Sequence, residues 1–338
     1  MKDDVSPQPV GWVSTGDLPT EAVVRGLVSD AHRLFASEQD GEVASYIPAL
    51  ASANRDHFGI CVAAVGGQLF EAGEATHSFS IQSLSKPFLF ALICQAIGEE
   101  KARDKLGVNS TGLPFNSVLA VERADDGLSN PMVNAGAIAA TSLAPGDSAD
   151  DKWDFIQSGF SRFAGRPLRI DEATYKSELA TNRRNVGIAN LLEEQECIWF
   201  DAEASTDLYT RQCALSVTAR DLALMSATLA NGGRQPLTGE QVIDQLICQR
   251  VLAVMVTAGL YETSGDWLYD TGLPGKTGVS GGLITVAPGK GGLATYSPPL
   301  DAAGNSVRGQ LTARYLSNRL GLNLFASRPY EPGGIGVG

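Results

Sequence analysis

The sequence predicts an α+β fold in which an antiparallel sheet is built from both ends of the chain and a helical lobe is inserted between them. Strand-like runs occur early, at 58–65 and 68–73, and they occur again late, at 283–287 and 293–297. The residues between these two groups read mostly as helices separated by loops rich in glycine, asparagine and proline. Strands at both ends with helices between them favour one sheet with an insertion over two separate domains.

The first part of the chain is expected to supply a helix and a hairpin. Residues 1–18 are predicted to form an irregular arm, and 19–35 a helix, because acidic residues near its start precede apolar residues at helical spacing. Residues 42–50 are predicted to form a loop. The runs 58–65 and 68–73 flank two glycines, which predicts a β-hairpin.

The later elements follow from the same criteria. A helix is expected from Ser83 to Ile97, with Ser83 or Ser85 capping its start. Further helices are expected where apolar residues recur at helical spacing, at 171–192 (one helix or a pair), 205–215, 218–231, 240–258 and 305–320.

These elements predict one domain over residues 1–325. Its sheet lobe is expected to cover about 1–82 and 260–325, and its helical lobe about 83–259. The remaining stretch, 326–338, is rich in glycine and proline and is predicted to be a flexible tail.

Composition excludes several classes of function. A net charge of −12 and a pI near 4.8, with no cluster of lysine and arginine, argue against a nucleic-acid partner. No signal peptide or membrane-spanning run is recognised, and the five widely spaced cysteines are typical of reduced core thiols, so we expect a cytoplasmic protein without a membrane partner. The three histidines form no metal-binding pattern, which predicts packing or surface roles for them and no zinc site.

Ser83 and Lys86 form the pattern most suggestive of chemistry. They lie three residues apart, so on a helix they share one face. A serine hydroxyl becomes nucleophilic when a base removes its proton, and a desolvated neutral lysine amine can act as that base. The alternative is a helix-capping serine beside a solvated lysine. With no histidine in a catalytic pattern, lysine is the natural candidate for the base.

A second motif, Lys276-Thr277-Gly278, is predicted on a strand near the end of the chain. A Ser-x-x-Lys followed much later by Lys-Thr-Gly resembles the serine β-lactamase and penicillin-binding-protein (DD-peptidase) superfamily. The resemblance implies an oxyanion hole formed by the backbone N–H groups of Ser83 and Val279. It also implies that Lys276 helps to hold Lys86 neutral. Four small residues are expected to let substrate approach the backbone: Gly275, Gly278, Gly281 and Gly282.

Several stretches from about residue 20 to 325 more closely resemble the serine-dependent glutaminase family, and they occur in that family's order. They are Gln82-Ser83-x-Ser85-Lys86, the runs 46–51, 115–116, 130–138 and 229–233, Lys276-Thr277-Gly278-Val279-x-Gly281-Gly282, and the run 297–306. The resemblance implies hydrolysis of L-glutamine to L-glutamate and ammonia, without a metal or organic cofactor, by a homodimer or homotetramer. No ankyrin-like repeats follow, which fits the compact bacterial form of the family.

By position, the family's catalytic and substrate-binding residues fall on Ser83, Lys86, Asn134, Glu178, Asn185, Tyr209, Tyr261 and Val279, with Tyr46 as a lid contact. The resemblance implies that Ser83 attacks the side-chain amide, that Lys86 is the base and that Tyr261 relays a proton to ammonia. Glu178 would pair with the substrate ammonium, while the asparagines and tyrosines would donate to its carboxylate. On its own, a helical glutamate such as Glu178 is more often a solvated charge.

Two other interpretations stay open at this point. One is a β-lactamase-like or DD-peptidase-like serine hydrolase, and the other is an amino-acid-binding module without catalysis. The absence of a recognisable signal peptide and the ammonium-plus-carboxylate chemistry of the pocket argue against the first. The intact serine and lysine pair argues against the second.

Overall fold

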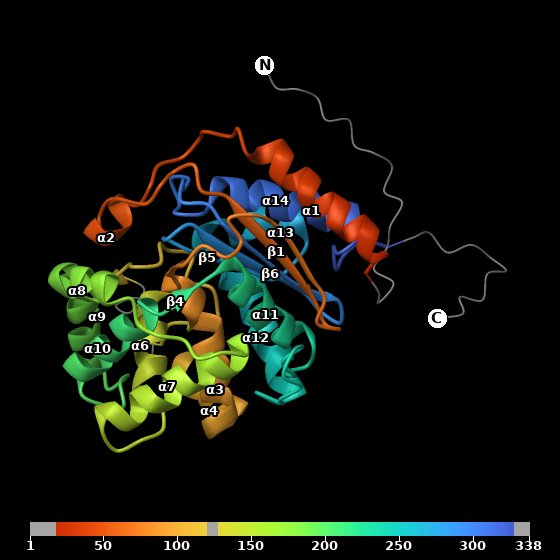
Figure 1. Ribbon diagram of the computed structural model, residues 1–338. Helices are drawn as coiled ribbons and strands as arrows, with labels where there is room; N and C mark the ends of the chain where they lie inside the picture. Colours follow the sequence, from red (N-terminus) through yellow and green to blue (C-terminus); the bar gives the residue numbers. More distant parts are fainter. Residues whose placement is uncertain (1–17, 120–127, 328–338) are drawn as a thin grey trace.

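The computed structural model describes residues 18–119 and 128–327 (Figure 1). The predicted N-terminal arm and C-terminal tail therefore lie almost wholly outside the described residues. Within them, the strands of the main sheet come from the early and late parts of the chain and most helices lie between, as the sequence predicts.

The sheet has five antiparallel strands in the order β2-β1-β7-β6-β5. Two strands come from the early part of the chain and three from the late part: β1 (Gly59–Ala64), β2 (Leu69–Gly73), β5 (Gly275–Gly278), β6 (Gly282–Ala287) and β7 (Gly291–Tyr296). The two groups meet where β1 pairs with β7, placing Val62 opposite Leu293. The predicted hairpin and the predicted antiparallel sheet from both chain ends are confirmed.

Both faces of the sheet are covered by helices, and residues alternate between the faces as expected for strands. One face packs against α1 (Glu21–Phe35) and α14 (Val307–Leu320), which lie together along it in Figure 1, near α13 (Ser264–Thr271). Ile60 and Val62 point to this face. Cys61 and Ala63, their neighbours in β1, point to the opposite face and its larger core.

The helix on that opposite face is α11 (Ala219–Ala230), which packs against β1, β6 and β7. A Cβ atom at Gly292 in β7 would lie 2.5 Å from the backbone oxygen of Ala223 and from the nitrogen of Ala227. Glycine therefore allows α11 to approach the sheet closely. Although α11 falls within the range predicted for the helical lobe, it belongs structurally to the sheet packing. The division into two lobes stays a prediction.

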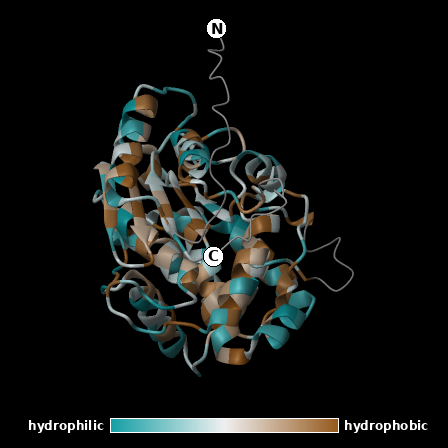
Figure 2. Ribbon diagram, turned by 90° about the vertical axis from the view of Figure 1, so that its right-hand side faces the viewer, coloured by the Kyte–Doolittle hydropathy of each residue, from teal (hydrophilic) through white to brown (hydrophobic). Residues whose placement is uncertain are grey.

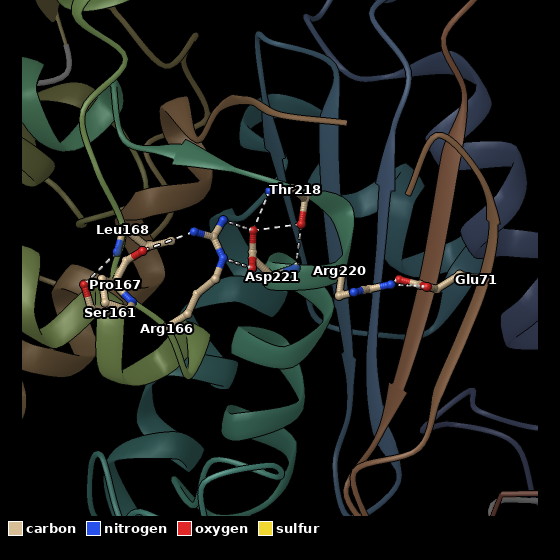
Figure 3. A network of polar contacts seen from close by, with 8 residues as sticks. All are labelled: Glu71, Ser161, Arg166, Pro167, Leu168, Thr218, Arg220 and Asp221. Carbon is tan, nitrogen blue, oxygen red and sulfur yellow. Dashed lines mark hydrogen bonds and ion pairs between the residues drawn. The ribbon is translucent and has the colours of Figure 1, made fainter. Parts of the chain in front are cut away.

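Ion pairs fix the start of α11 from both sides (Figure 3). Buried Asp221 forms a capping box with Thr218. It also accepts two hydrogen bonds, of 2.7 and 2.6 Å, from the guanidinium of Arg166, a residue that follows α7 (Ala149–Ala164). On the other side, Arg220 makes a similar double contact with Glu71 in β2. Such paired contacts are geometrically specific. They orient α11 between the helices and the sheet.

The remaining helices form the predicted helical part around α3 (Ser85–Ile97), whose residues from Ser85 to Cys94 are all buried. Figure 2 shows hydrophobic colouring along the central elements and more hydrophilic segments among the outer helices. A helix buried on every side belongs to the core of a large domain. The other helices here are α4 (Glu99–Leu106), α6 (Asn134–Ser142), α7 (Ala149–Ala164), α8 (Glu172–Thr181), α9 (Arg183–Glu194), α10 (Ala202–Cys213) and α12 (Gln245–Ala258).

Three local predictions need correction. Residues Pro48–Ala51 form a helical turn, α2, because Pro48 is favourable in the first turn of a helix. Helix α12 begins at Gln245 rather than at 240, since Arg234 and Gln241 form a β-bridge just before it. Neither Ser83 nor Ser85 caps α3, because a 3₁₀ turn, η1 (Gln82–Leu84), leads directly into the helix.

Candidate active site

A cavity of about 280 Å³ lies beside Ser83. It is lined by residues from distant parts of the chain: Tyr46, Ile47, Gln82, Ser83, Phe115, Asn116, Asn134, Glu178, Thr181, Asn182, Arg184, Asn185, Tyr209, Cys213 and Val279. Seven of the nine sequence-predicted site residues are in this set; Lys86 and Tyr261 are buried behind Ser83. A cavity of this size with convergent polar groups suits a small polar ligand.

Ser83 lies at the cavity on the short segment that connects strand β3 (Phe79–Ser80) to helix α3. The two-residue strand β3 pairs with β4 (Ser216–Val217) and leads into η1 and then α3. Gln82, just before the serine, has φ of +52°, a left-handed conformation that is unfavourable for a residue with a Cβ. This strained residue forms the sharp turn that leads directly into Ser83.

Lys86 is 1% exposed, and its Nζ lies 2.6 Å from Ser83 Oγ and 3.0 Å from Asn134 Oδ1. Burial lowers the pKa of Lys86 to about 8, against an opposing influence from Cys213 and Glu178. When the amine is neutral, it accepts a hydrogen bond from the Ser83 hydroxyl and donates one to Asn134. The predicted dyad is therefore assembled, with lysine in the environment that a base requires.

Lys276 is also fully buried, with its Nζ 4.0 Å from the centre of the Tyr261 ring and donating to the Thr277 carbonyl at 3.0 Å. Burial, followed by repulsion from Lys86, lowers its pKa well below the usual value. Burial is the main cause of the lowered pKa of both amines, and the repulsion from Lys86 at Lys276 indicates that each lysine disfavours the charged form of the other. The expectation that Lys276 helps to hold Lys86 neutral stays a prediction.

Tyr261 begins a second 3₁₀ turn, η2 (Tyr261–Thr263), and has φ of +57°. Its buried hydroxyl makes no hydrogen bond within the described residues, although Ser83 lies close enough to oppose the rise in its pKa that burial causes. Phe115 packs against the same ring at 5.0 Å between centroids. A strained backbone and an unpartnered hydroxyl beside the nucleophile are features of a functional position rather than of a packing residue.

Asn134 links the dyad to the far wall of the cavity. It starts α6, where its backbone N–H donates to the Phe115 carbonyl at 2.8 Å. Its Oδ1 also accepts from the Tyr209 hydroxyl at 3.2 Å, and its Nδ2 donates to Asn185 Oδ1 at 3.0 Å. The same oxygen also accepts a hydrogen bond from the Lys86 amine. Asn134 therefore bonds to three other site residues, namely Lys86, Tyr209 and Asn185. Its side chain bonds across the cavity wall rather than to the backbone of its own helix.

Glu178 on α8 is 9% exposed and lies at the cavity rather than in solvent. Burial raises its pKa to about 7, while a hydrogen bond from Gln82 and the charge of Lys86 oppose the shift. The Gln82 amide donates to Glu178 Oε1 at 2.5 Å and to Ser80 Oγ at 3.1 Å. The Glu178 carboxylate is therefore buried against a neutral amide, and a cation bound in the cavity would stabilise its charged form.

Val279 follows β5 at the edge of the sheet and lines the cavity beside η1. The glycines around it do not serve substrate access as expected. A Cβ on Gly275 would strike Trp267, one on Gly282 would strike Leu84, and those on Gly278 and Gly281 would likewise meet protein atoms. Their role is close packing of β5 and β6 against the rest of the chain.

Tyr46 lies at the cavity mouth and is 56% exposed, as suits the predicted lid contact. The adjoining α2 is fastened to the other side of the cavity by the Ala49 N–H, which donates to Ser177 Oγ at 3.1 Å. Ile47 and Leu50 pack with Val279 in a small separate hydrophobic cluster. This segment joins the sheet side to α8 across the opening.

Some cavity residues were not assigned individual roles by sequence reasoning. Gln82 was part of a motif, and its position before the nucleophile was the available signal. Cys213 was expected to be a core thiol; all five cysteines are free and buried, but Cys213 also lines the cavity. Arg184 precedes Asn185 in a helix with an irregular pattern and gave no clear signal.

The three histidines lie away from the cavity. His32 stacks on Phe58, His57 and His77 pack near Tyr296, and none of them lines the cavity. Residues 18–119 and 128–327 contain no group of three or more His, Cys, Asp or Glu side chains placed to hold a metal. Among the same residues, no single helix is long and apolar enough to cross a membrane; α12 and 261–271 reach the criterion only together, with a 91° bend.

Comparison with known proteins identifies the family. The sequence profile of the glutaminase family matches residues 41–325. The chain belongs to the glutaminase family. It is 57% identical over 328 residues to "Glutaminase 2" of Yersinia pestis, covering 97% of this chain and 96% of that one. It is 44% identical to a glutaminase of Colwellia psychrerythraea, over 91% of this chain and 99% of the relative.

Solved structures of glutaminases have the same fold. A probable glutaminase, ybaS, superposes with a TM-score of 0.90 at 39% identity, covering 91% of this chain and all of that one. A probable glutaminase from Bacillus subtilis, complexed with 6-diazo-5-oxo-L-norleucine, gives 0.80 at 32% identity over 89% and 96% of the two chains. The β-lactamase-like fold implied by the sequence is confirmed, and family membership makes this chain an amidohydrolase of the glutaminase type.

Proposed function

We propose that this chain hydrolyses L-glutamine to L-glutamate and ammonia through a covalent γ-glutamyl ester on Ser83, with Lys86 as the base. The observation that carries the mechanism is the 2.6 Å hydrogen bond between Ser83 Oγ and the buried Nζ of Lys86. The contact lies beside the cavity, and burial lowers the pKa of the amine to about 8, which supports Lys86 as the base for a serine nucleophile. The glutamate-bound relative titled "Mglu in its glutamate form" supports this substrate class.

The first half-reaction forms the ester. Ser83 Oγ attacks the side-chain amide carbon of glutamine as Lys86 takes the hydroxyl proton. The N–H groups of Ser83 and Val279 are proposed to stabilise the resulting oxyanion, since both residues line the cavity. Collapse of the intermediate breaks the C–N bond, and the Lys86 proton passes to the departing ammonia, with Tyr261 as the relay.

The second half-reaction regenerates the serine. Water attacks the ester carbon while Lys86 accepts a proton from it, and the Ser83–carbonyl bond then breaks. The proton returns to Ser83 Oγ and glutamate is released. Lys86, Tyr261 and Ser83 carry the proton transfers in this scheme. Neither half-reaction changes an oxidation state.

Substrate orientation is proposed to depend on charges at the far end of the cavity. Glu178 would receive the α-ammonium, replacing its contact with the neutral Gln82 amide. Asn185 and the second amide N–H of Asn134 would donate to the α-carboxylate, and Tyr209 would do so by exchanging its hydrogen bond to Asn134 for one to the substrate. Tyr46 would cover the bound ligand from the mouth. A homodimer or homotetramer remains a proposal from the family resemblance.

Ammonia release separates this function from its two alternatives. We expect the purified chain to release ammonia rapidly from L-glutamine, at least about a hundredfold slower from L-asparagine, and to leave a chromogenic β-lactam intact. Asparagine is one methylene shorter, so its amide carbon would not reach Ser83 while both charged ends are held. Hydrolysis of the β-lactam instead of glutamine would favour the peptidase-like reading. Glutamine binding without ammonia release would favour a binding module.

The rate should fall as the pH decreases. Lys86 is neutral only above its pKa of about 8, and Glu178 is ionised only above its pKa of about 7, so both active forms lie on the alkaline side. We expect kcat/KM to drop roughly tenfold per pH unit below 8 and more steeply below 7. The measurement is kcat/KM from pH 5.5 to 9.5 at constant ionic strength. A flat profile down to pH 6 would contradict a lysine base.

A further inference from the structure

Charged side chains are sparse around the cavity. Among its described lining residues, Glu178 is the only carboxylate and Arg184 is the only lysine or arginine. Lys86 and Lys276 lie deeper and are fully buried. A cavity wall with one anion and one cation matches an α-amino acid, whose ammonium and carboxylate groups share a single carbon atom.

Arg184 is available to bind an anion. Its side chain is exposed at the cavity, and no ion pair or hydrogen bond to it occurs among residues 18–119 and 128–327. The other basic groups fixed near the helical part, such as Arg166 and Arg211, are paired with aspartates. An unpaired guanidinium at a pocket mouth keeps its full capacity for a carboxylate.

Other polar side chains at the start of α9 lie beside Arg184. Arg184 lies in the first turn of α9, a helix of 12 residues whose N-terminus has no side-chain cap. Asn182, Arg184 and Asn185, from this same turn, all line the cavity. The Asn182 side chain donates to Thr210 at 3.1 Å, and its buried Oδ1 has no partner among the described residues. Because Asn182 also ends α8, the opposite partial charges of the two helix ends meet here, and the Arg184 guanidinium supplies the full positive charge of this wall.

Resting on the proposed placement of glutamine, we propose that Arg184, together with the first turn of α9, binds the substrate α-carboxylate and determines specificity for substrates that carry one. Asn185 supplies a directed hydrogen bond one residue along, and Arg184 supplies the charge that the neutral asparagines and tyrosines lack. Glu178 and Arg184 then hold the two charged groups of the α-carbon between α8 and α9, and the side-chain amide extends towards Ser83.

The test uses a substrate without the charge. L-glutamine α-amide retains the α-ammonium and the side-chain amide but replaces the α-carboxylate with a neutral carboxamide. Arg184→Gln should lower kcat/KM for L-glutamine about three- to tenfold, chiefly by raising KM, because the contact is partly exposed to solvent. The same substitution should change kcat/KM for the α-amide less than about twofold. Arg184→Lys, which keeps the charge, should restore most of the loss for glutamine.

Arg183→Gln is the matched control, because Arg183 is the preceding residue of the same turn but does not line the cavity. It should change kcat/KM for either substrate less than about twofold. An equal loss for glutamine and the α-amide in Arg184→Gln, or an unchanged rate for glutamine, would overturn the inference while leaving the hydrolytic mechanism standing. Failure of the wild type to hydrolyse glutamine would overturn both.

Discussion

Ser83→Ala should abolish glutamine hydrolysis, lowering kcat by about a thousandfold or more, and Lys86→Ala should lower it by a similar factor. The serine forms the proposed covalent bond, and the lysine at 2.6 Å is the base placed to activate it. Because the two act as one unit, the double variant should be within about threefold of either single variant. The measurement is steady-state ammonia release, with glutamine binding followed by calorimetry in Ser83→Ala.

Ser85→Ala is a matched control for this experiment. Ser85 is buried two residues from the nucleophile, but its hydroxyl accepts from the Gln212 amide at 3.2 Å and does not line the cavity. We expect it to retain more than about a tenth of the wild-type kcat. Retention of a tenth of the wild-type rate by Ser83→Ala or Lys86→Ala would remove the dyad from the mechanism.

The second large effect concerns the substrate ammonium. N-acetyl-L-glutamine, which lacks that charge, should be hydrolysed at least about a hundredfold less efficiently than L-glutamine by the wild type, because it would leave Glu178 buried without a cation. Glu178→Gln should lower kcat/KM for glutamine by about 10- to 100-fold through loss of a charge-assisted hydrogen bond. The same variant should lower the ratio of kcat/KM for L-glutamine to kcat/KM for N-acetyl-L-glutamine. The measurement is kcat/KM of the wild type and of Glu178→Gln with each of the two substrates.

Glu172→Gln controls for a change of charge on the same helix, because Glu172 is exposed in the first turn of α8. It should leave the ratio between the two substrates unchanged within about twofold. Comparable turnover of glutamine and N-acetylglutamine by the wild type would exclude Glu178 as the ammonium-binding residue. That result would not affect the assignment of Ser83 and Lys86.

The sheet and its hairpin could be predicted because local patterns carried the information. Strand-like runs at both chain ends and the two glycines between the early pair indicate antiparallel pairing without knowledge of distant contacts. The start of α3 could not be predicted in this way. Serines commonly cap helices, but the left-handed Gln82 and the 3₁₀ turn at Ser83 depend on packing between β3 and the helical core.

The chemical identity of the site was readable from spaced motifs, whereas its electrostatics was not. The order of residues shows that Lys86 and Lys276 are both present, but only the folded chain shows that both amines are buried and that burial is the main cause of their lowered pKa. Glu178 illustrates the same limit, since a glutamate on a helix is usually solvated and only the fold places it against the cavity. The position of Arg184 at the cavity depends on how α9 begins directly after α8, and no local sequence pattern predicts that geometry.

The central claim is that Ser83 carries a γ-glutamyl ester during turnover, and acid quenching followed by peptide mass spectrometry tests it most directly. Wild-type enzyme quenched during rapid hydrolysis of L-glutamine should yield the peptide containing Ser83 with the added mass of one glutamyl group. Ser83→Ala treated in the same way should show no adduct at any residue. A glutamyl adduct on another side chain, or continued hydrolysis by Ser83→Ala at a rate near that of the wild type, would contradict the proposed mechanism.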